Sequence, residues 1–324
     1  MIVRSLLVGA LMASVNGFCY AQPVFPIWPN GEAPGASSSK TQPQVVERSK
    51  DPSLPDRAAT GIRRPEMTVY QAENPNGTAL LVMPGGAYQR VVLDKEGSDL
   101  APFFNQRGYT LFVMTYRMPG EGHQEGADAP LADAQRAIRT LRAHADKWHI
   151  NPQRIGIMGF SAGGHVAASL GTRFAQSVYP TTDAIDNVSA RPDFMVLMYP
   201  VISMQPALAH AGSRQQLIGA APTETQTTRY SLEKQVTSQT PPTFLVHAVD
   251  DPSVSVDNSL VMFNALREKQ IPVEMHLFEK GKHGFGLRGT KGLPAAAWPQ
   301  LLDSWLRALP DTSEQPENAQ HKVP

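Results

Sequence analysis

Short apolar runs alternate with segments of helical periodicity along most of the chain. Apolar runs of six or seven residues are typical of strands buried on both faces of a sheet, and they lie at 78–83, 110–116, 154–159, 194–200, 243–249 and 273–278. Apolar positions at helical spacing predict helices over 95–107, 131–148, 161–174, 256–270 and 296–309. Strands that alternate with helices in this way predict an α/β fold, with a mostly parallel central sheet and helices on both faces.

Residues 201–242 interrupt this alternation. The segment is long, polar and weakly patterned, with a possible short helix near Gln215–Ile218. A long excursion between two core strands often lies over a functional site. We therefore predict that this segment forms a cap or rim of the same domain and is not a second domain.

The two ends of the chain differ from its middle. Met1–Arg4 is a short positive start, Ser5–Phe18 is mostly apolar, and small residues at Cys19 and Ala21 suit a signal peptidase. The apolar run is too short and too broken for stable membrane insertion, and a lipid anchor at Cys19 is the alternative. We expect export to the periplasm or the medium after cleavage near Ala21.

The predicted organisation follows from these patterns and from local composition. Pro, Gly, Ser and charged residues dominate the segment after the leader, and polar residues dominate the C-terminal end. We predict a signal peptide at 1–21, an irregular arm at 22–65, the α/β domain at 66–309 and a disordered tail at 310–324.

Composition excludes several classes of function. The 324 residues include 29 Lys and Arg and 29 Asp and Glu, so the formal net charge is zero, and no basic run suggests nucleic-acid binding. The single cysteine, Cys19, lies in the predicted leader, which leaves the mature chain without a thiol for catalysis or a Cys-based metal site. The histidines show no metal-binding spacing, so we expect no catalytic metal and no cofactor. The oligomeric state is not predicted.

GIMGFSAGGH, residues 156–165, contains Ser161 in the pattern Gly-x-Ser-x-Gly. The pattern lies between a predicted strand and a predicted helix, where a sharp turn can expose a serine hydroxyl as a nucleophile. At the helix start, the N–H of Ala162 would face a developing oxyanion. The alternative is a junction whose small residues only allow strand and helix to pack closely. His165, one turn further on, is expected to pack or hydrogen-bond within this junction.

A nucleophilic serine needs a base, and the base needs a carboxylate that orients it. In doubly wound hydrolases these groups follow the serine in the order acid, then histidine. HAVDDPSV follows one predicted strand and presents Asp250 and Asp251, and GKHGFG follows the last strand and presents His283. We predict Ser161, Asp251 and His283 as catalytic residues, with Asp250 as the alternative to Asp251.

The segment MPGGAY, residues 83–88, follows the first core strand. Its glycines allow backbone N–H groups to turn toward the site, so we predict an oxyanion hole formed by the N–H groups of Gly86, Ala87 and Ala162. A plain glycine turn is the alternative. Aromatic residues next to these loops are predicted to contact substrate, namely Tyr88, Phe160 and Phe285.

In this order, PGGAY, GFSAGGH, HAVDDPSV and GKHGFG resemble the serine esterases of the α/β-hydrolase fold. Four further segments resemble exported bacterial acetyl xylan esterase-like enzymes: PIWPNGEAPGA, VVLDKEGSDLAPFF, YRMPGEGH and SLEKQVTSQTPPTFLVHAVDD. The resemblance covers about residues 25–308 and implies a small-molecule or oligosaccharide ester as substrate. The chain departs from such enzymes at Ala87, where a third glycine is frequent, and at Lys95, where an acidic residue or histidine is usual. Glu96 could border the site.

We therefore expect a serine esterase that removes acetyl groups from xylan or xylo-oligosaccharides through an acyl-enzyme. One alternative keeps the mechanism but acts on feruloyl, short-chain or aryl esters. A serine peptidase is a further alternative, although too few residues precede the first core strand for the propeller of an oligopeptidase. The last alternative function is a catalytically inactive sugar-binding protein. The presence of all three triad residue types argues against this alternative.

Overall fold

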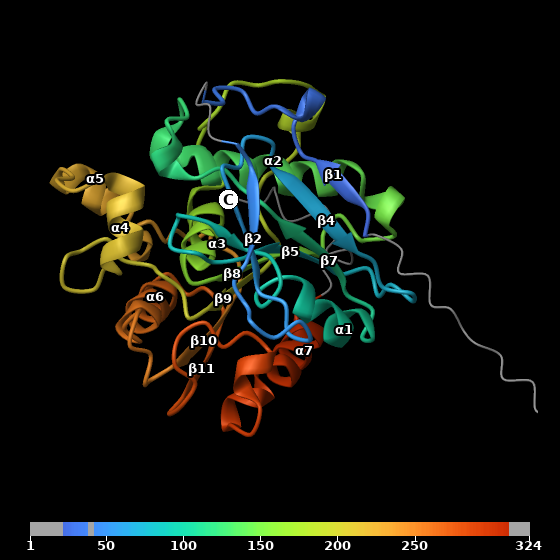
Figure 1. Cartoon of the computed structure of the whole chain (residues 1–324), viewed down its shortest axis with the longest axis vertical. Helices are drawn as coiled ribbons and strands as arrows, with labels where there is room; N and C mark the ends of the chain where they lie inside the picture. The colour runs from blue at the N-terminus through green and yellow to red at the C-terminus, as the bar shows by residue number, and fades with distance from the viewer. Residues whose placement is uncertain (1–21, 38–41, 311–324) are drawn as a thin grey trace, which may run out of the picture.

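An eight-stranded sheet runs through the centre of the protein in the order β1-β4-β7-β5-β8-β9-β10-β11 (Figure 1). The structure is a computed structural model that describes residues 22–37 and 42–310. The strands are β1 (Val24–Pro26), β4 (Glu66–Tyr70), β5 (Ala79–Met83), β7 (Thr110–Met114), β8 (Ile155–Phe160), β9 (Met195–Met198), β10 (Thr243–Ala248) and β11 (Val273–Phe278). The six strands from β5 to β11 in this sheet are mutually parallel, as predicted, and β1 and β4 add an antiparallel edge.

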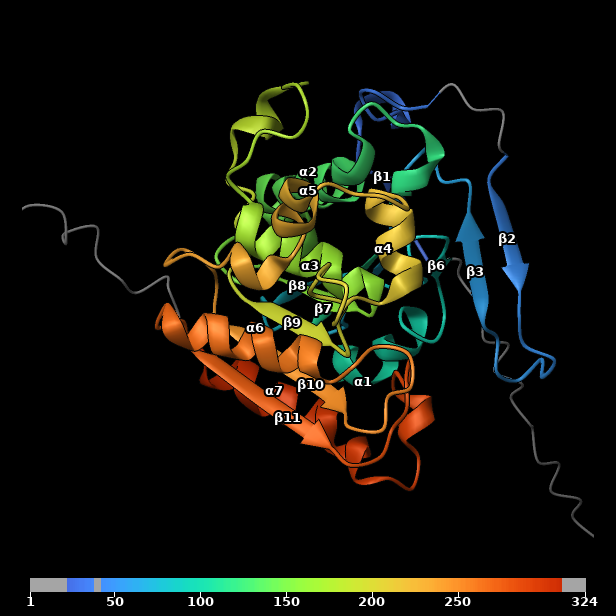
Figure 2. The ribbon, with the colours of Figure 1, turned by 90° about the vertical axis from the view of Figure 1, so that its left-hand side faces the viewer.

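Helices cover both faces of this sheet (Figures 1 and 2). The helices on these faces are α1 (Ala101–Asn105), α2 (Ala129–Ala143), α3 (Ala162–Arg173), α6 (Asp257–Glu268) and α7 (Trp298–Ala308). Alternate side chains of one strand enter different cores: Leu81 packs in the core shared with α2, α3 and α6, whereas Leu80 packs in the core shared with α1 and α7. Burial on both faces explains why the central strands are apolar throughout.

Nine short 3₁₀ helices complete the regular structure of the described ranges. They are Pro29–Gly31, Ser98–Leu100, Pro119–Glu121, Gly126–Asp128, Ala145–Trp148, Ala184–Asn187, Leu232–Lys234, Arg288–Thr290 and Pro294–Ala297. Ser98–Leu100 leads directly into α1, and Ala145–Trp148 follows α2. Together with α1 and α2, these two therefore account for most of the helices predicted at 95–107 and 131–148.

The N-terminal arm is more ordered than the irregular segment predicted for residues 22–65. β1 pairs with β4, and β2 (Gln44–Glu47) and β3 (Arg57–Thr60) form a second, antiparallel sheet with β6 (Val91–Val92). Figure 2 shows β2 and β3 as a pair along one side of the molecule. Pattern alone missed these strands because each is short, and pairing with distant partners outweighs local composition.

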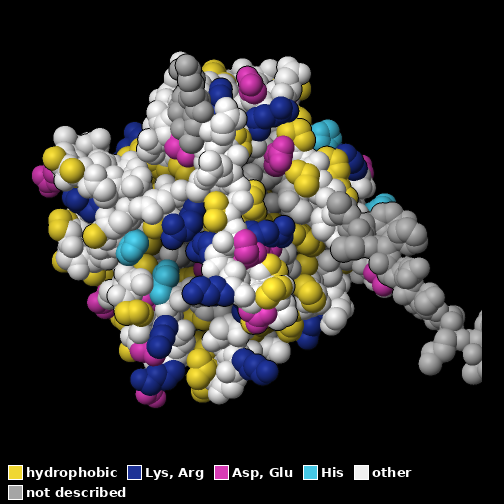
Figure 3. Space-filling view, viewed as in Figure 1, with side chains coloured by type: hydrophobic (Ala, Val, Ile, Leu, Met, Phe, Trp, Pro, Cys, Tyr) yellow, Lys and Arg dark blue, Asp and Glu magenta, His cyan; other side chains and the backbone are white. Residues whose placement is uncertain are grey.

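Residues 201–242 hold two short helices, α4 (Ala211–Ile218) and α5 (Glu224–Arg229), which project from the body of the protein in Figure 1. This segment leaves the carboxyl end of β9 and returns at β10. It therefore lies where a rim was predicted, at the edge of the sheet where parallel strands end. In the space-filling view from the same side, Lys and Arg side chains gather near the centre of this face beside histidine side chains (Figure 3).

The predicted signal peptide (residues 1–21) and the predicted tail from residue 311 onward lie outside the described residues. Within residues 22–37 and 42–310, we find no helix with the length and apolar character needed to cross a membrane.

Candidate active site

Ser161 occupies a sharp turn between the last residue of β8 and the first residue of α3. Its φ angle is 52°, a left-handed value that costs a non-glycine residue of order 1–3 kcal/mol. Two backbone hydrogen bonds hold the turn: the Ser161 N–H donates to the Met198 carbonyl at 3.0 Å, and the Val201 N–H donates to the Ser161 carbonyl at 3.0 Å. The strained turn is thus imposed by the end of the neighbouring strand β9.

The glycines around Ser161 are required by close packing. A Cβ atom on Gly163 would lie 2.0 Å from the Met83 carbonyl oxygen, and one on Gly159 would lie 2.2 Å from the Gly163 carbonyl oxygen. The first turn of α3 therefore lies directly against the end of β5. The small-residue junction and the left-handed serine are consequences of the same turn, so the two sequence-based interpretations are compatible.

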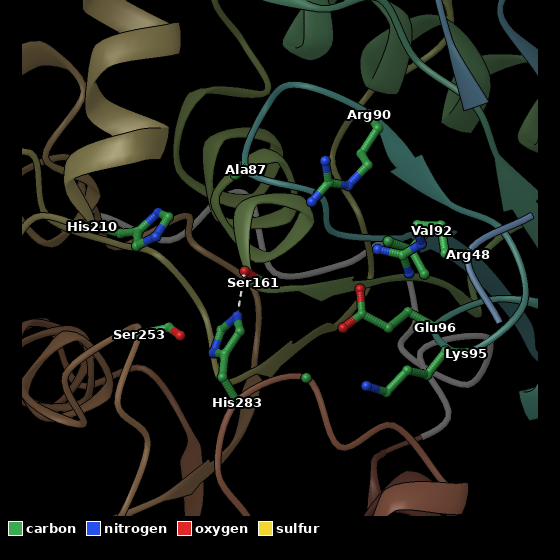
Figure 4. Close-up of a pocket in the computed structure, with 12 residues that line it drawn as sticks. Arg48, Ala87, Arg90, Val92, Lys95, Glu96, Ser161, His210, Ser253 and His283 are labelled. Carbon is green, nitrogen blue, oxygen red and sulfur yellow. Dashed lines mark hydrogen bonds between the residues drawn. The ribbon is translucent and has the colours of Figure 1, made fainter. Parts of the chain in front are cut away.

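Ser161, His283 and Asp251 form a continuous chain of hydrogen bonds. The Ser161 Oγ lies 2.8 Å from His283 Nε2 (Figure 4), and His283 Nδ1 lies 2.6 Å from Asp251 Oδ2. A carboxylate only accepts hydrogen bonds, so Nδ1 carries the hydrogen and Nε2 accepts from the serine hydroxyl. The three residues follow β8, β11 and β10, at the carboxyl edge of the sheet where ligands of such folds bind.

The Asp251 carboxylate is buried and fully hydrogen-bonded. Its Oδ1 accepts from the N–H groups of Ser253 and Val254 at 2.8 and 2.9 Å, and its Oδ2 lies 3.3 Å from His247 Nε2. Burial acts to raise the pKa of Asp251, but the hydrogen bonds from His247 and His283 and the backbone outweigh it. The pKa of Asp251 is therefore well below its usual range, and the carboxylate beside His283 stays ionised.

The Asp250 carboxylate binds backbone N–H groups and does not contact His283. Its Oδ1 accepts from the N–H groups of Gly281 and Lys282 at 2.9 and 2.8 Å. These residues begin the loop that carries His283, so Asp250 anchors that loop to the end of β10. Of the two adjacent aspartates, the structure places Asp251 against the histidine.

The loop after β5 presents unpaired backbone N–H groups next to Ser161. Gly86 has a φ angle of 139°, and a Cβ there would lie 2.1 Å from the Arg90 carbonyl oxygen, so only glycine fits. Ala87 also has a left-handed φ, of 56°. Within the described ranges, the N–H groups of Gly86 and Ala87 have no protein acceptor, and the Ala162 N–H begins a helix, where no intrahelical acceptor exists.

Glu96 anchors the loop after β5 by a hydrogen bond of its carboxylate. Its Oε2 accepts from the Gly85 N–H at 2.8 Å, and its Oε1 accepts from the Tyr199 hydroxyl at 2.9 Å. The Tyr199 hydroxyl in turn accepts from the Gly286 N–H at 3.1 Å. Glu96 therefore borders the site and links the loop after β5 to the loop that carries His283.

A cavity of about 270 Å³ opens in front of Ser161. It is lined by Arg48, Gly86, Ala87, Arg90, Val92, Lys95, Glu96, Ser161, His210, Ser253, His283 and Gly284 (Figure 4). Sequence analysis did not single out Arg48, Arg90, His210 or Ser253. They come from the N-terminal arm, the loop after β5, the rim segment 201–242 and the loop after β10, and no local pattern marks residues that meet only in the fold. Within the described residues, no cluster of three or more His, Cys, Asp or Glu side chains could hold a metal ion.

The three aromatic residues predicted to contact substrate do not line this cavity. Tyr88, Phe160 and Phe285 are each at most 2% exposed. Phe160 and Phe285 pack against the ring of Tyr199, with centroids 5.8 and 4.5 Å apart. Their rings face the hydrophobic core below the site, so these residues support the catalytic loops from within.

Tyr88 belongs to a buried network centred on His165. The Tyr88 hydroxyl lies 2.7 Å from His165 Nδ1, and His165 Nε2 lies 2.8 Å from the Tyr230 carbonyl oxygen. Because a carbonyl only accepts, Nε2 carries the hydrogen and Nδ1 accepts from the tyrosine hydroxyl. The network joins the loop after β5, helix α3 and the rim segment 201–242. Burial of the imidazole lowers the pKa of His165 to about 4.

We expect the free energy of unfolding to decrease with falling pH more steeply in the natural protein than in the His165→Gln variant. An unfolded histidine binds a proton near pH 6.5, whereas folded His165 resists protonation down to about pH 4. Stability is therefore present above pH 6.5 and lost as the pH falls toward 4, with about 2 kcal/mol lost between pH 7 and 5. Urea unfolding at both pH values measures this loss.

His144→Gln is the matched control, because His144 is exposed. This control variant should lose as much stability between pH 7 and 5 as the natural protein. Equal losses in the natural protein and His165→Gln would show that the buried network does not resist protonation.

The chain is similar to several known proteins. The BD-FAE family model matches residues 67–266. The chain is 40% identical over 205 residues to endo-1,4-beta-xylanase B of Butyrivibrio fibrisolvens. The aligned region is 63% of this chain and 32% of that protein. It is 32% identical over 253 residues to the acetylxylan esterase of Xylanibacter ruminicola. That aligned region is 77% of this chain and 49% of the esterase. The chain thus spans about a third to a half of the length of these two relatives.

A solved structure matches over a larger share of both chains. The acetyl ester-xyloside bifunctional hydrolase from Caldicellulosiruptor lactoaceticus aligns with a TM-score of 0.72 and 34% identity, over 90% of this chain and 97% of that one. The family match covers more than half of the chain, and the fold likeness covers 90% of it. This chain belongs to the BD-FAE family of esterases with the α/β-hydrolase fold.

Proposed function

We propose that this protein hydrolyses carboxylic esters with Ser161 as nucleophile, His283 as base and Asp251 as the group that orients the base. The observation that carries the proposal is the hydrogen-bonded chain from Asp251 through His283 to Ser161, which ends at an open cavity. Ser161 is 7% exposed and the His283 side chain 22% exposed, so both can reach a bound ester.

In the first half of the reaction, the Ser161 Oγ attacks the ester carbonyl carbon while its proton passes to His283 Nε2. Asp251 holds the imidazole in the required tautomer and stabilises the cation that forms. The N–H groups of Gly86, Ala87 and Ala162 donate to the tetrahedral oxyanion. The carbon–oxygen bond to the alcohol then breaks, and the alcohol leaves with the proton from His283.

In the second half, water attacks the acyl group on Ser161. His283 removes one proton from the water, a second oxyanion forms in the same hole, and its collapse releases the acid. The proton on His283 returns to the Ser161 Oγ. No group other than those already named is required for this cycle.

We propose an acetylated xylan or xylo-oligosaccharide as the substrate. Of the described residues that line the cavity, none is Phe, Tyr or Trp, and only Ala87 and Val92 have apolar side chains. The volume of about 270 Å³ is just below the range of about 300–1,000 Å³ that is usual for small-molecule sites. A short acyl group on a hydroxyl-rich alcohol suits this lining better than an aromatic acyl group such as feruloyl. Two similar proteins are named for acetyl ester or acetylxylan hydrolysis.

The test compares acetate release from acetylated xylo-oligosaccharides with hydrolysis of methyl ferulate and 4-nitrophenyl acetate. We expect kcat/KM for the oligosaccharide to exceed that for methyl ferulate by about tenfold or more, because the cavity offers no aromatic contact. Faster turnover of methyl ferulate would contradict the acetyl preference and favour the feruloyl alternative. Hydrolysis of 4-nitrophenyl acetate without hydrolysis of the other two esters would indicate a general esterase with no preference for acetylated xylo-oligosaccharides.

A further inference from the structure

The cavity at Ser161 contains more positive than negative charge. Among its described lining residues, Arg48, Arg90 and Lys95 are cations and Glu96 is the one carboxylate, which leaves a net charge of +2 when the histidines are neutral. The whole chain has a formal net charge of zero. Asp251 adds a negative charge behind His283, where its carboxylate is buried and away from the cavity wall. Because Arg48 is paired with Asp56, the unpaired positive charge on the cavity wall comes from Arg90 and Lys95.

Two of these cations have no ion-pair partner among residues 22–37 and 42–310. Arg48 pairs with Asp56, with 2.7 Å between its guanidinium and the carboxylate. Within the described ranges, Arg90 and Lys95 form no ion pair, and the Nε of Arg90 is buried without any hydrogen-bond partner. A buried donor without an acceptor is unfavourable, so such a group in a cavity indicates a site for an external acceptor.

Glu96 does not neutralise these cations by direct contact. Both of its carboxylate oxygens accept from groups of the protein, the Gly85 N–H and the Tyr199 hydroxyl. In Figure 4 the Arg90 guanidinium is turned toward the space in front of Ser161, the Lys95 ammonium is turned toward the loop that carries His283, and Glu96 lies between the two in this view.

Both cations belong to segments that lie against the loops of the site. The Arg90 N–H donates to the Gly86 carbonyl at 3.3 Å, so Arg90 ends the turn of the loop after β5. Lys95 lies against the loop that carries His283: its Nζ would be 3.7 Å from a Cβ on Gly284, and its carbonyl oxygen 2.5 Å from one on Gly286. An anion bound by either side chain would therefore lie beside the loops that carry Ser161 and His283.

We propose that Arg90 and Lys95 bind a carboxylate of the substrate, so that the preferred esters are acidic. The guanidinium and ammonium groups would donate charge-assisted hydrogen bonds to that carboxylate. The carboxylate can belong to the alcohol, as a uronic acid on an acetylated oligosaccharide, or to the acyl group, as in a dicarboxylic acid monoester. The inference rests on the proposed ester hydrolysis and names its substrate class.

The first experiment uses two pairs of substrates that differ only in the carboxylate. One pair is acetylated xylo-oligosaccharides with and without a glucuronic acid branch, and the other is 4-nitrophenyl succinate and 4-nitrophenyl acetate. We expect the acidic member of one pair to have a kcat/KM at least about tenfold higher. This advantage should shrink severalfold when NaCl is raised from about 0.05 to 0.5 M. An advantage in the first pair places the carboxylate on the alcohol, and one in the second pair places it on the acyl group.

The second experiment tests the two residues. Arg90→Gln and Lys95→Gln should each lower the ratio of acidic to neutral kcat/KM about tenfold. Lys269→Gln makes the same charge change just beyond the C-terminal end of α6, at the opposite edge of the sheet, and should leave the ratio unchanged. If Arg90→Gln fails to fold, Lys95→Gln and the salt dependence still decide the question.

The outcomes separate this inference from the proposed function. Equal kcat/KM for the acidic and neutral members of both pairs, with acetate released from the neutral oligosaccharide, overturns the carboxylate site and leaves the esterase assignment standing. A ratio unchanged by either glutamine variant also overturns it. A folded natural protein that cleaves none of the four esters overturns the proposed function, and the inference with it.

Discussion

Replacing Ser161 with alanine should lower kcat/KM for 4-nitrophenyl acetate by about 10⁴-fold or more and leave the fold intact. The Oγ hydrogen-bonds to His283 Nε2, and no other protein group acts as a nucleophile in the proposed reaction. Backbone hydrogen bonds of residue 161 to Met198 and Val201 hold the turn between β8 and α3, and alanine retains both of them. Steady-state kinetics of the purified variant, together with its circular dichroism spectrum and thermal unfolding, measure the two halves of this expectation.

Ser304→Ala removes the same hydroxyl from an exposed position on α7 and serves as the control. Its kcat/KM should match that of the natural protein. A folded Ser161→Ala variant that retains more than about 1% of the natural activity would refute Ser161 as the nucleophile, because loss of a triad member normally costs far more.

Asp251→Asn should lower kcat/KM by about 10³–10⁴-fold, the second-largest effect that we expect. Asparagine has one acceptor oxygen, whereas Asp251 accepts from the backbone N–H groups of Ser253 and Val254 with one oxygen and contacts His283 with the other. An amide N–H placed toward His283 Nδ1 would favour the tautomer with the hydrogen on Nε2. That nitrogen could then no longer accept the Ser161 proton.

Asp250→Asn is the matched control for this variant. The side-chain carbonyl of asparagine can still accept from the N–H groups of Gly281 and Lys282, which are the contacts that Asp250 makes. We expect less than about a tenfold loss, through a small shift of the His283 loop. Kinetics of both variants near pH 8 decide between the adjacent aspartates, and a larger loss in Asp250→Asn would reverse their assignment.

The central sheet was predictable because its strands are buried on both faces and are therefore apolar for their whole length. β5 is an example, since each of its residues is buried. The strands of the arm were not predictable on this basis. β2 has four exposed residues, and its antiparallel neighbour β3 pairs with Val91 and Val92 of β6, more than 30 residues further along the chain. Their extended form depends on partners that a local pattern does not contain.

Side-chain direction limited the predictions for the cavity. Phe160 ends β8 immediately before the nucleophile, yet its ring faces the core on the side of Tyr199. Tyr88 follows Ala87 in left-handed backbone, with φ of 60°, which turns its side chain inward to His165. Sequence proximity to a catalytic loop therefore did not imply contact with the cavity.

The amino-acid order is enough to predict which chemical groups follow which strands: a serine in a glycine-flanked turn, two adjacent acids, a glycine-flanked histidine and a glycine-rich loop. The folded chain is needed to show that Asp251 faces His283 while Asp250 anchors a backbone loop, and that Arg90 and Lys95 share the cavity of Ser161. The order of strands and loops is encoded locally in buried runs and turn residues, whereas the direction of a side chain and the charge of a cavity depend on segments that meet only when the chain folds.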